Sequence, residues 1–298
     1  MTFRSLGDAL PSNRDLLARV QGMAERAIGK SRSQDVPKPP LAAQLPAWGD
    51  EIRGMANEVL RSSLFNARNR NQPRQYLKNE AIAIIDKSAS IIYTGEELRQ
   101  NDESVWLQLI HMARKVPIGS PVEFTPYEMV QALRVAKSKP NKGHRKRLFE
   151  SLRRMQANSL SIHSKRLARG VSLSMIPKFE WQAEASGAPL KKWRAFIAPE
   201  MVHLFSDDYV THLQWAQRLD LPCGVATWLH GYLASHREPL PIKLSTLQKG
   251  SGCTTETARK FKQIVATALS ELKRVGFLRL GEIRGELVYA ERLLTTDL

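Results

Sequence analysis

Apolar residues recur at intervals of three and four along residues 254–275, which is the spacing of one buried face of an α-helix. Thr254 or Thr255 is expected to cap this helix, and Gly276 is expected to end it. The buried face contains Phe261, Ile264, Val265, Ala268, Leu269, Leu272 and Val275. The opposite face contains Glu256, Arg259, Lys260, Gln263 and Thr267. Such polar groups suit contacts with DNA base edges and phosphates.

The segments on both sides extend this pattern into a larger arrangement. Residues 244–249 are expected to form a short helix, capped by Ser245 and stopped by Gly250 and Gly252. Two strands around a glycine turn follow, at residues 277–283, Arg284-Gly285 and residues 286–293. A short helix, a tight turn, a long helix and a hairpin together indicate a winged helix-turn-helix, which is a DNA-binding arrangement.

A similar order of predicted elements occurs about 120 residues earlier in the chain. Thr125 is expected to cap a short helix of residues 126–133, with Pro126 at its first position and Glu128 in its first turn. A second helix follows at residues 142–157. Its predicted inward residues are Leu148, Leu152 and Met155, and its predicted outward residues are Lys146, Arg147, Glu150 and Arg154. Two strands with a basic tip complete this copy, at residues 159–164, Lys165, Arg166, Arg169 and residues 171–176.

These two copies predict an α+β protein with two tandem winged-helix domains and a flexible N-terminal tail. The tail spans residues 1–49 and contains one amphipathic helix, at residues 13–30, and a Pro-rich linker. The first winged-helix domain spans residues 50–204, and the second spans residues 205–298. Further strands of the first domain are expected at residues 81–85, 91–93, 179–182 and 193–197, with a helix capped by Asn101 or Asp102.

The charge of the chain indicates a polyanionic partner. Lysine and arginine number 45 against 29 acidic residues, which gives a formal net charge of +16. A membrane surface is the weaker interpretation, because no run of about 18 apolar residues is present. The first thirty residues also lack the apolar core of a secretory signal. Cys223 and Cys253 have no Cys-x-x-Cys partner, which predicts reduced cysteines in a cytoplasmic protein.

The positive charge is concentrated on the first predicted recognition helix and wing. Residues 137–170 contain eleven lysines and arginines and one acid, Glu150. A solvated charged face is the alternative explanation for such a run, but its place on these elements favours DNA contact. The predicted DNA-binding residues are Lys142, Lys146, Arg147, Arg154, Lys165, Arg166, Arg169, Lys249, Thr255, Glu256, Arg259, Lys260, Gln263 and Arg284. Of these, Arg259 and Gln263 are expected to read base edges.

The segment Gln44-Leu45-Pro46-Ala47-Trp48 resembles the pentapeptide by which bacterial replication proteins bind the sliding clamp. In that pattern Gln44 would bond at a pocket rim, and Leu45 and Trp48 would fill the pocket. The usual pattern has Ser or Asp and then Leu at the positions of Pro46 and Ala47. The alternative is that Leu45 and Trp48 pack onto the first domain of the chain itself.

Enzyme classes that act on DNA leave no signal in the sequence. A rolling-circle nickase needs a His-x-His metal motif, and none is present. The glycine-rich phosphate loop of an ATPase is also absent. The chain is therefore expected to be a binding protein that is not an enzyme and that needs no metal or other cofactor.

Two stretches resemble the TrfA-type replication initiators of broad-host-range bacterial plasmids. The first begins at Tyr93-Thr94-Gly95 and continues through Leu98, Gln100, Asp102, Val105-Trp106, His111, Ala113-Arg114, Gly119 and Phe124-Thr125. The second contains Leu204-Phe205, Asp207-Asp208, Trp215, Arg218-Leu219, Trp228-Leu229-His230 and Ser235-His236-Arg237-Glu238-Pro239. Together the resemblance covers roughly residues 44 to 294.

The resemblance implies tandem winged-helix domains that bind directly repeated origin sites, called iterons, in double-stranded DNA. It further implies opening of adjacent A+T-rich DNA, contact with single-stranded origin DNA, and recruitment of the host sliding clamp, replicative helicase and host initiator. Family members act as monomers on DNA and also form inactive homodimers. A transcriptional repressor built on the same two domains is the alternative function, because fold does not fix function.

Overall fold

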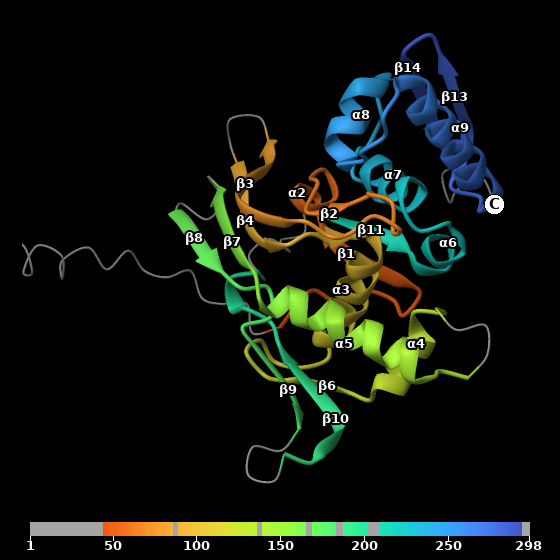
Figure 1. The fold of residues 1–298 in the computed structure, drawn as a ribbon. Helices are drawn as coiled ribbons and strands as arrows, with labels where there is room; N and C mark the ends of the chain where they lie inside the picture. The colour runs from red at the N-terminus through yellow and green to blue at the C-terminus, as the bar shows by residue number, and fades with distance from the viewer. Residues whose placement is uncertain are drawn as a thin grey trace, which may run out of the picture. The chain divides into compact units, whose positions relative to one another are not determined.

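The same order of helices and strands occurs twice in the computed structural model of the chain (Figure 1). The first copy consists of α3 (Gln100–Ala113), β6 (Val122–Phe124), α4 (Pro126–Ala132), α5 (Lys142–Gln156), β9 (Lys178–Gln182) and β10 (Pro189–Phe196). The second copy consists of α7 (Val225–Ala234), β12 (Ile242–Lys243), α8 (Leu244–Ser251), α9 (Ala258–Arg274), β13 (Leu278–Arg284) and β14 (Leu287–Arg292). Their sheets have equivalent strand orders, β6-β10-β9 and β12-β14-β13. Helices α5 and α9 therefore hold equivalent positions, and so do hairpins β9–β10 and β13–β14.

The structure describes residues 44–85, 89–135, 139–164, 169–182, 187–201 and 209–293, and for residues 83–85, 89, 163–164 and 169–171 it describes the backbone alone. Residues Ala42–Leu298 group into one compact unit. The predicted helix at residues 13–30 and the Pro-rich linker lie outside the described residues.

The remaining elements surround the first copy. Strands β3 (Tyr76–Ile85), β4 (Ala89–Glu96), β7 (Ser159–Ser164) and β8 (Arg169–Leu173) form a sheet in that order. Strand β1 (Ile52–Ala56) pairs antiparallel with β11 (Val210–Gln214), and β2 (Phe65–Asn66) pairs parallel with β5 (Leu98–Arg99). Two short helices complete the described fold, α2 (Asn57–Leu60) and α6 (Trp215–Asp220).

The hairpin predicted as the first wing, β7–β8, is not the equivalent of β13–β14. Strand β7 pairs with β4, with Ile162 opposite Ile91, and both side chains are buried. The apolar alternation of this segment predicted β7 with its observed bounds, but it placed the second strand at residues 171–176 instead of Arg169–Leu173. It could not identify the partner of β7, because alternation fixes the faces of a strand and not its neighbour. Hairpin β9–β10 stands in the equivalent position instead.

Two hydrophobic clusters lie within the unit. The first contains residues from Leu45 to Trp215, including Trp106 and Phe124, and the second is built mainly from residues after Leu221. Phe261, Val265, Ala268, Leu269 and Leu272 of α9 belong to the second cluster, as the sequence predicted. The predicted domain boundary between residues 204 and 205 lies within residues 202–208, which the structure does not describe. The division into domains therefore stays a prediction.

Local sequence signals explain where the helices of each copy begin and end. Thr125 and Glu128 form a capping box at α4, and Asn141 caps α5 by accepting a hydrogen bond from His144 N (3.0 Å). The predicted cap of α3 was wrong, because the helix begins at Gln100 after Arg99, and the predicted caps of the second copy were wrong as well. Helix α9 is capped by Thr257, whose side chain accepts from Lys260 N (3.2 Å), and α8 follows Lys243 instead of Ser245. Gly250 lies inside α8, which ends at Gly252 in the left-handed conformation (φ 62°).

Buried polar contacts join the two copies. The guanidinium of Arg218 is inaccessible to solvent and pairs with the buried carboxylate of Glu103 in the first turn of α3 (3.2 Å). The same guanidinium donates to the Thr227 carbonyl in α7 (3.3 Å), and Trp228 Nε1 donates to the Ser62 carbonyl (3.1 Å). Such contacts hold the two copies in one arrangement, because separating a buried charge from its partner strongly destabilises the fold.

Two further observations bear on the class of protein. Within the ranges given above, none of the helices combines the length and the apolar character that crossing a membrane requires. Both cysteines are free thiols, as the sequence predicted, and Cys253 is buried.

Candidate nucleic-acid interface

Helix α9 presents a polar face to solvent, as its periodicity predicted. Arg259, Lys260 and Gln263 are exposed on the side opposite the buried Phe261 and Val265. Thr255 and Glu256 precede the helix, because the cap is Thr257. Glu256 is exposed in this turn, whereas Thr255 is half-buried and accepts from Gln248 Nε2 (3.2 Å). The interface on α9 therefore consists of three long side chains in its first two turns, and Glu256 is not on the helix face.

Hairpin β13–β14 is tied to the same end of α9. Lys262 Nζ donates to the Gly285 carbonyl at the hairpin turn (2.7 Å). Arg284 lies beside this turn, pairs with Glu282 and stacks over the Tyr289 ring at 4.9 Å. Lys249 is exposed near the end of α8. An exposed ion pair such as that of Arg284 contributes little free energy, so its guanidinium is available to a phosphate.

Helix α5 presents the more basic surface. Lys142, Lys146 and Arg147 are exposed, and Lys146 forms only a weak ion pair with Glu150 along the helix (3.8 Å). The predicted outward position of Arg154 is wrong. Its side chain is 11% exposed and donates to Asp102 Oδ1 (2.8 Å), because Asp102 is fully buried beneath α5 and needs cationic partners.

The basic tip predicted for the first wing lies largely beyond the description. Lys165 and Arg166 lie outside the described residues, and only the backbone of Arg169, in β8, is described. The hairpin in the wing position, β9–β10, carries exposed Lys191 and Lys192, which are not among the predicted DNA-binding residues. The two strands were predicted at residues 179–182 and 193–197, but as further strands of the first domain and not as its wing.

Cation–π contacts fix α5 on that hairpin. Arg145 lies 5.5 Å from the Trp193 ring and Arg153 lies 5.3 Å from the Trp181 ring. Phe149, one turn from each arginine, packs edge-on against both tryptophans. Arg145 and Arg153 remain exposed although they contact these rings, and Arg153 lies on the same side of α5 as Lys142 and Lys146, so both arginines add to the basic surface of the helix.

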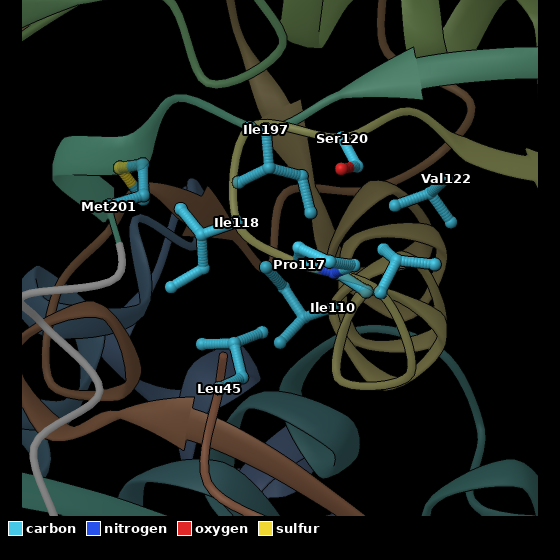
Figure 2. A pocket seen from close by; sticks show the side chains of 11 residues that line it. Leu45, Ile110, Pro117, Ile118, Ser120, Val122, Ile197 and Met201 are labelled. Atoms are coloured by element: carbon cyan, nitrogen blue, oxygen red, sulfur yellow. The ribbon is translucent and has the colours of Figure 1, made fainter. Parts of the chain in front are cut away.

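The segment with the clamp-like pentapeptide lies against the first cluster. Figure 2 shows Leu45 pointing toward Ile110, Pro117 and Ile118, where it lines a cavity of about 20 Å³. Trp48 is buried and donates from Nε1 to His111 Nδ1 (3.2 Å). This placement corresponds to the packing interpretation. Clamp binding through Leu45 and Trp48 stays a prediction and would require the segment to leave this site.

Leu45→Ala is expected to lower the free energy of unfolding by about 2–5 kcal/mol, because it removes a buried side chain and enlarges the cavity that already adjoins it. Urea unfolding followed by tryptophan fluorescence would measure it. Leu240→Ala, at a side chain that is 78% exposed, is the control and should change stability by less than about 0.5 kcal/mol. Unchanged stability of Leu45→Ala, with loss of sliding-clamp capture, would favour the clamp anchor instead.

The buried histidines near these elements are neutral at pH 7. Desolvation, together with the charges of Arg53 and Arg114, lowers the pKa of His111 to about 4. Desolvation and the charge of Arg218 lower the pKa of His230 to about 3. In the part of the chain that the structure describes, no three His, Cys, Asp or Glu side chains come together as a metal site would require.

The fold is similar to that of domains 2 and 3 of RctB, as seen in a crystal structure of selenomethionine derivatives. The TM-score is 0.52 at 12% sequence identity, over 79% of this chain and 98% of that chain. The likeness concerns the fold alone, and it defines an α+β protein with that architecture.

The sequence itself shows the family. The sequence model of the family described as TrfA protein matches residues 11–292. The chain is 32% identical over 280 residues to the plasmid replication initiator protein TrfA of Escherichia coli, covering 93% of this chain and 72% of that protein. It is 25% identical over 218 residues to the replication protein RepA of Salmonella typhi, covering 72% and 60%. The chain belongs to the TrfA family of plasmid replication initiators.

Proposed function

We propose that both copies are winged-helix domains and that the chain binds directly repeated origin sites in double-stranded DNA. One observation carries this proposal. Helices α5 and α9 hold equivalent positions and leave polar faces exposed, while buried contacts such as Arg218–Glu103 join the copies that carry them. Two recognition helices held in one frame suit two successive major-groove segments.

The two copies differ in a way that suits direct repeats. The exposed face of α5 is almost entirely cationic, whereas that of α9 adds Gln263 to its charges. The first copy would supply phosphate contacts, and the second would read bases. Two unlike copies in one chain form an asymmetric DNA-binding surface, which fits a direct repeat better than a palindrome.

The proposed sequence of events uses binding energy alone. The chain would bind the repeats, favour opening of adjacent A+T-rich DNA, and bring in the host helicase, initiator and clamp. Its role in this proposal is that of a binding protein and not of an enzyme. The family membership supports this order of events over the alternative of a transcriptional repressor.

The test is a footprint on the origin of the plasmid that encodes the chain. Initiation predicts protection of tandem direct repeats, together with permanganate-reactive thymines in a neighbouring A+T-rich segment. Protection of a promoter palindrome without any reactive thymines would reject initiation and favour the repressor.

Arg259→Ala is expected to weaken binding to the selected repeat by about 1–3 kcal/mol and to leave binding to random DNA nearly unchanged, because a base contact carries sequence information. Fluorescence anisotropy on both DNAs at one salt concentration would measure the difference. Lys273→Ala is the matched control, an exposed cation about 20 Å farther along α9. Equal losses on both DNAs would reject base reading by Arg259.

A further inference from the structure

The loop between β2 and β3 places an exposed polar tip beside the first copy. Its residues Asn69, Arg70, Asn71 and Gln72 are exposed, and the preceding Asn66 and Ala67 are buried. Polar loops of this composition are usually solvated connections. Three features of this loop, namely its rigid base, its position and its charge, indicate a more specific role.

The base of the loop is held by buried charges. The Arg99 guanidinium donates to the carbonyls of Asn69 (3.0 Å) and Pro73 (3.1 Å), one on each side of the tip, and is itself paired with the buried Glu97. Arg74 donates to the fully buried Asp102 (2.8 Å). A loop fixed in this way loses little conformational entropy when its tip binds a partner.

One side of the loop contacts the turn that precedes the second recognition helix. Ala67 N donates to the Ser251 carbonyl (2.7 Å), and Thr254 Oγ1 donates to Gln72 Oε1 (3.1 Å). The approach at the turn is close, because a Cβ atom on Gly252 would lie 2.9 Å from Asn66 Cβ. The tip therefore adjoins the start of α9.

The other side of the loop is linked to the first recognition helix. Asp102, which binds Arg74 of the loop, also accepts from Ser151 (2.5 Å) and Arg154 (2.8 Å) of α5. The loop thus occupies the surface between the two recognition helices.

Arg70 brings an uncompensated charge to this surface. The other arginines of the loop are paired, Arg68 with Glu97 (3.1 Å) and Arg74 with Asp102. Arg70 has no carboxylate within 4.0 Å among the residues for which side chains are described. An exposed guanidinium without a carboxylate partner, on a loop whose base is fixed between two DNA-reading helices, suits a nucleic-acid contact.

Resting on the proposed function, we propose that the loop of residues 69–72 is a third DNA-contacting element whose Arg70 enters the minor groove. Two major-groove segments on one side of a duplex are separated by a minor groove, and an element between two recognition helices faces it. Arginine is the side chain that a narrow A+T-rich minor groove attracts most strongly. Gln72 is a positioning residue, since it ties the tip to Thr254.

The test uses the full chain and the repeat that the wild-type chain selects. Arg70→Ala should weaken binding by roughly tenfold, and Arg70→Lys should restore only part of this loss. Three versions of the repeat carry A·T, inosine·cytosine or G·C pairs in the segment between the major-groove contacts. Wild type should bind the first two alike and the third more weakly, because only guanine places an amino group in the minor groove. Arg70→Ala should bind all three alike.

Arg237→Ala is the matched control, because Arg237 is exposed beyond the far end of α7 and should leave all three affinities unchanged. Wild-type affinity for Arg70→Ala would overturn the proposal, and so would a loss of affinity with the base-pair dependence of wild type intact. If wild type selects no repeat with two major-groove contacts, the proposed function fails first. If it selects one and only the Arg70 effects are missing, this inference alone fails.

Discussion

Arg218→Ala should lower the free energy of unfolding by about 3–5 kcal/mol, because it leaves the carboxylate of Glu103 buried without its cation. The truncation also removes the donor to the Thr227 carbonyl, so both copies lose a contact at their junction. Urea unfolding monitored by circular dichroism would measure the loss. A change below about 1 kcal/mol would show that the pair does not hold the copies together.

Two controls separate the buried pair from a general effect of charge. Arg279→Ala removes an arginine that is 69% exposed and paired with Glu291 on the surface, and it should cost less than about 1 kcal/mol. The double variant Arg218→Met with Glu103→Leu removes both charges and should recover much of the stability. If the double variant is as unstable as Arg218→Ala, the loss comes from packing and not from the unpaired carboxylate.

The pH dependence of the free energy of unfolding provides a second test of the Arg218–Glu103 pair. Burial raises the pKa of Glu103, and the charge of Arg218 opposes this rise. A carboxyl group with a raised pKa in the folded state favours folding below its unfolded pKa, and this contribution is lost as the pH rises through the folded pKa. In Arg218→Ala the pKa rises further. The difference in the free energy of unfolding between Arg218→Ala and the wild type should therefore be small near pH 4 and should grow as the pH increases.

A variant with Lys142, Lys146 and Arg147 all replaced by alanine should bind DNA with a much weaker dependence on salt. Each lost phosphate contact lowers the slope of log affinity against log salt by about 0.9, so three contacts lower it by about 2.7. Between 50 and 200 mM salt, the wild type should then lose roughly 40-fold more affinity than the variant. Anisotropy titrations over this range would measure both slopes.

The control for this variant removes three exposed cations elsewhere, with Lys78, Lys115 and Arg237 replaced by alanine. Both variants lose the same formal charge, so they differ only in where it is lost. Equal reductions of slope would show that net charge, and not the surface of α5, sets the salt dependence. An unchanged slope in the α5 variant would remove these residues from the interface.

The sequence predicted local features well, because their causes are local. The buried faces of α5 and α9 follow from apolar spacing, and the cap of α4 follows from Thr125 and Glu128. The cap of α9 was wrong because three threonines, Thr254, Thr255 and Thr257, offer similar side chains, and local sequence does not choose among them.

The errors in the candidate interface have non-local causes. Arg154 has the spacing of an outward residue, but a buried carboxylate 52 positions earlier turns it inward. The loop tip meets the α8–α9 turn through residues 182 positions apart, Gln72 and Thr254. No pattern within either segment could reveal that contact, because it depends on the packing of the two copies.

The pairing of β1 with β11 has a consequence for how such chains can be recombined. Strand β11 precedes the second copy, yet its partner lies ahead of the first, with Ile52 opposite Gln214 and Ala56 opposite Val210. A hybrid protein made from two relatives and joined near residue 205 would pair β1 of one relative with β11 of the other. A junction after Asp220 would keep the ribbon and α6 of one parent intact, although the pair Arg218–Glu103 would then have to meet a foreign α7. The part of the chain that could be exchanged as one unit is therefore smaller than the predicted second domain, residues 205–298.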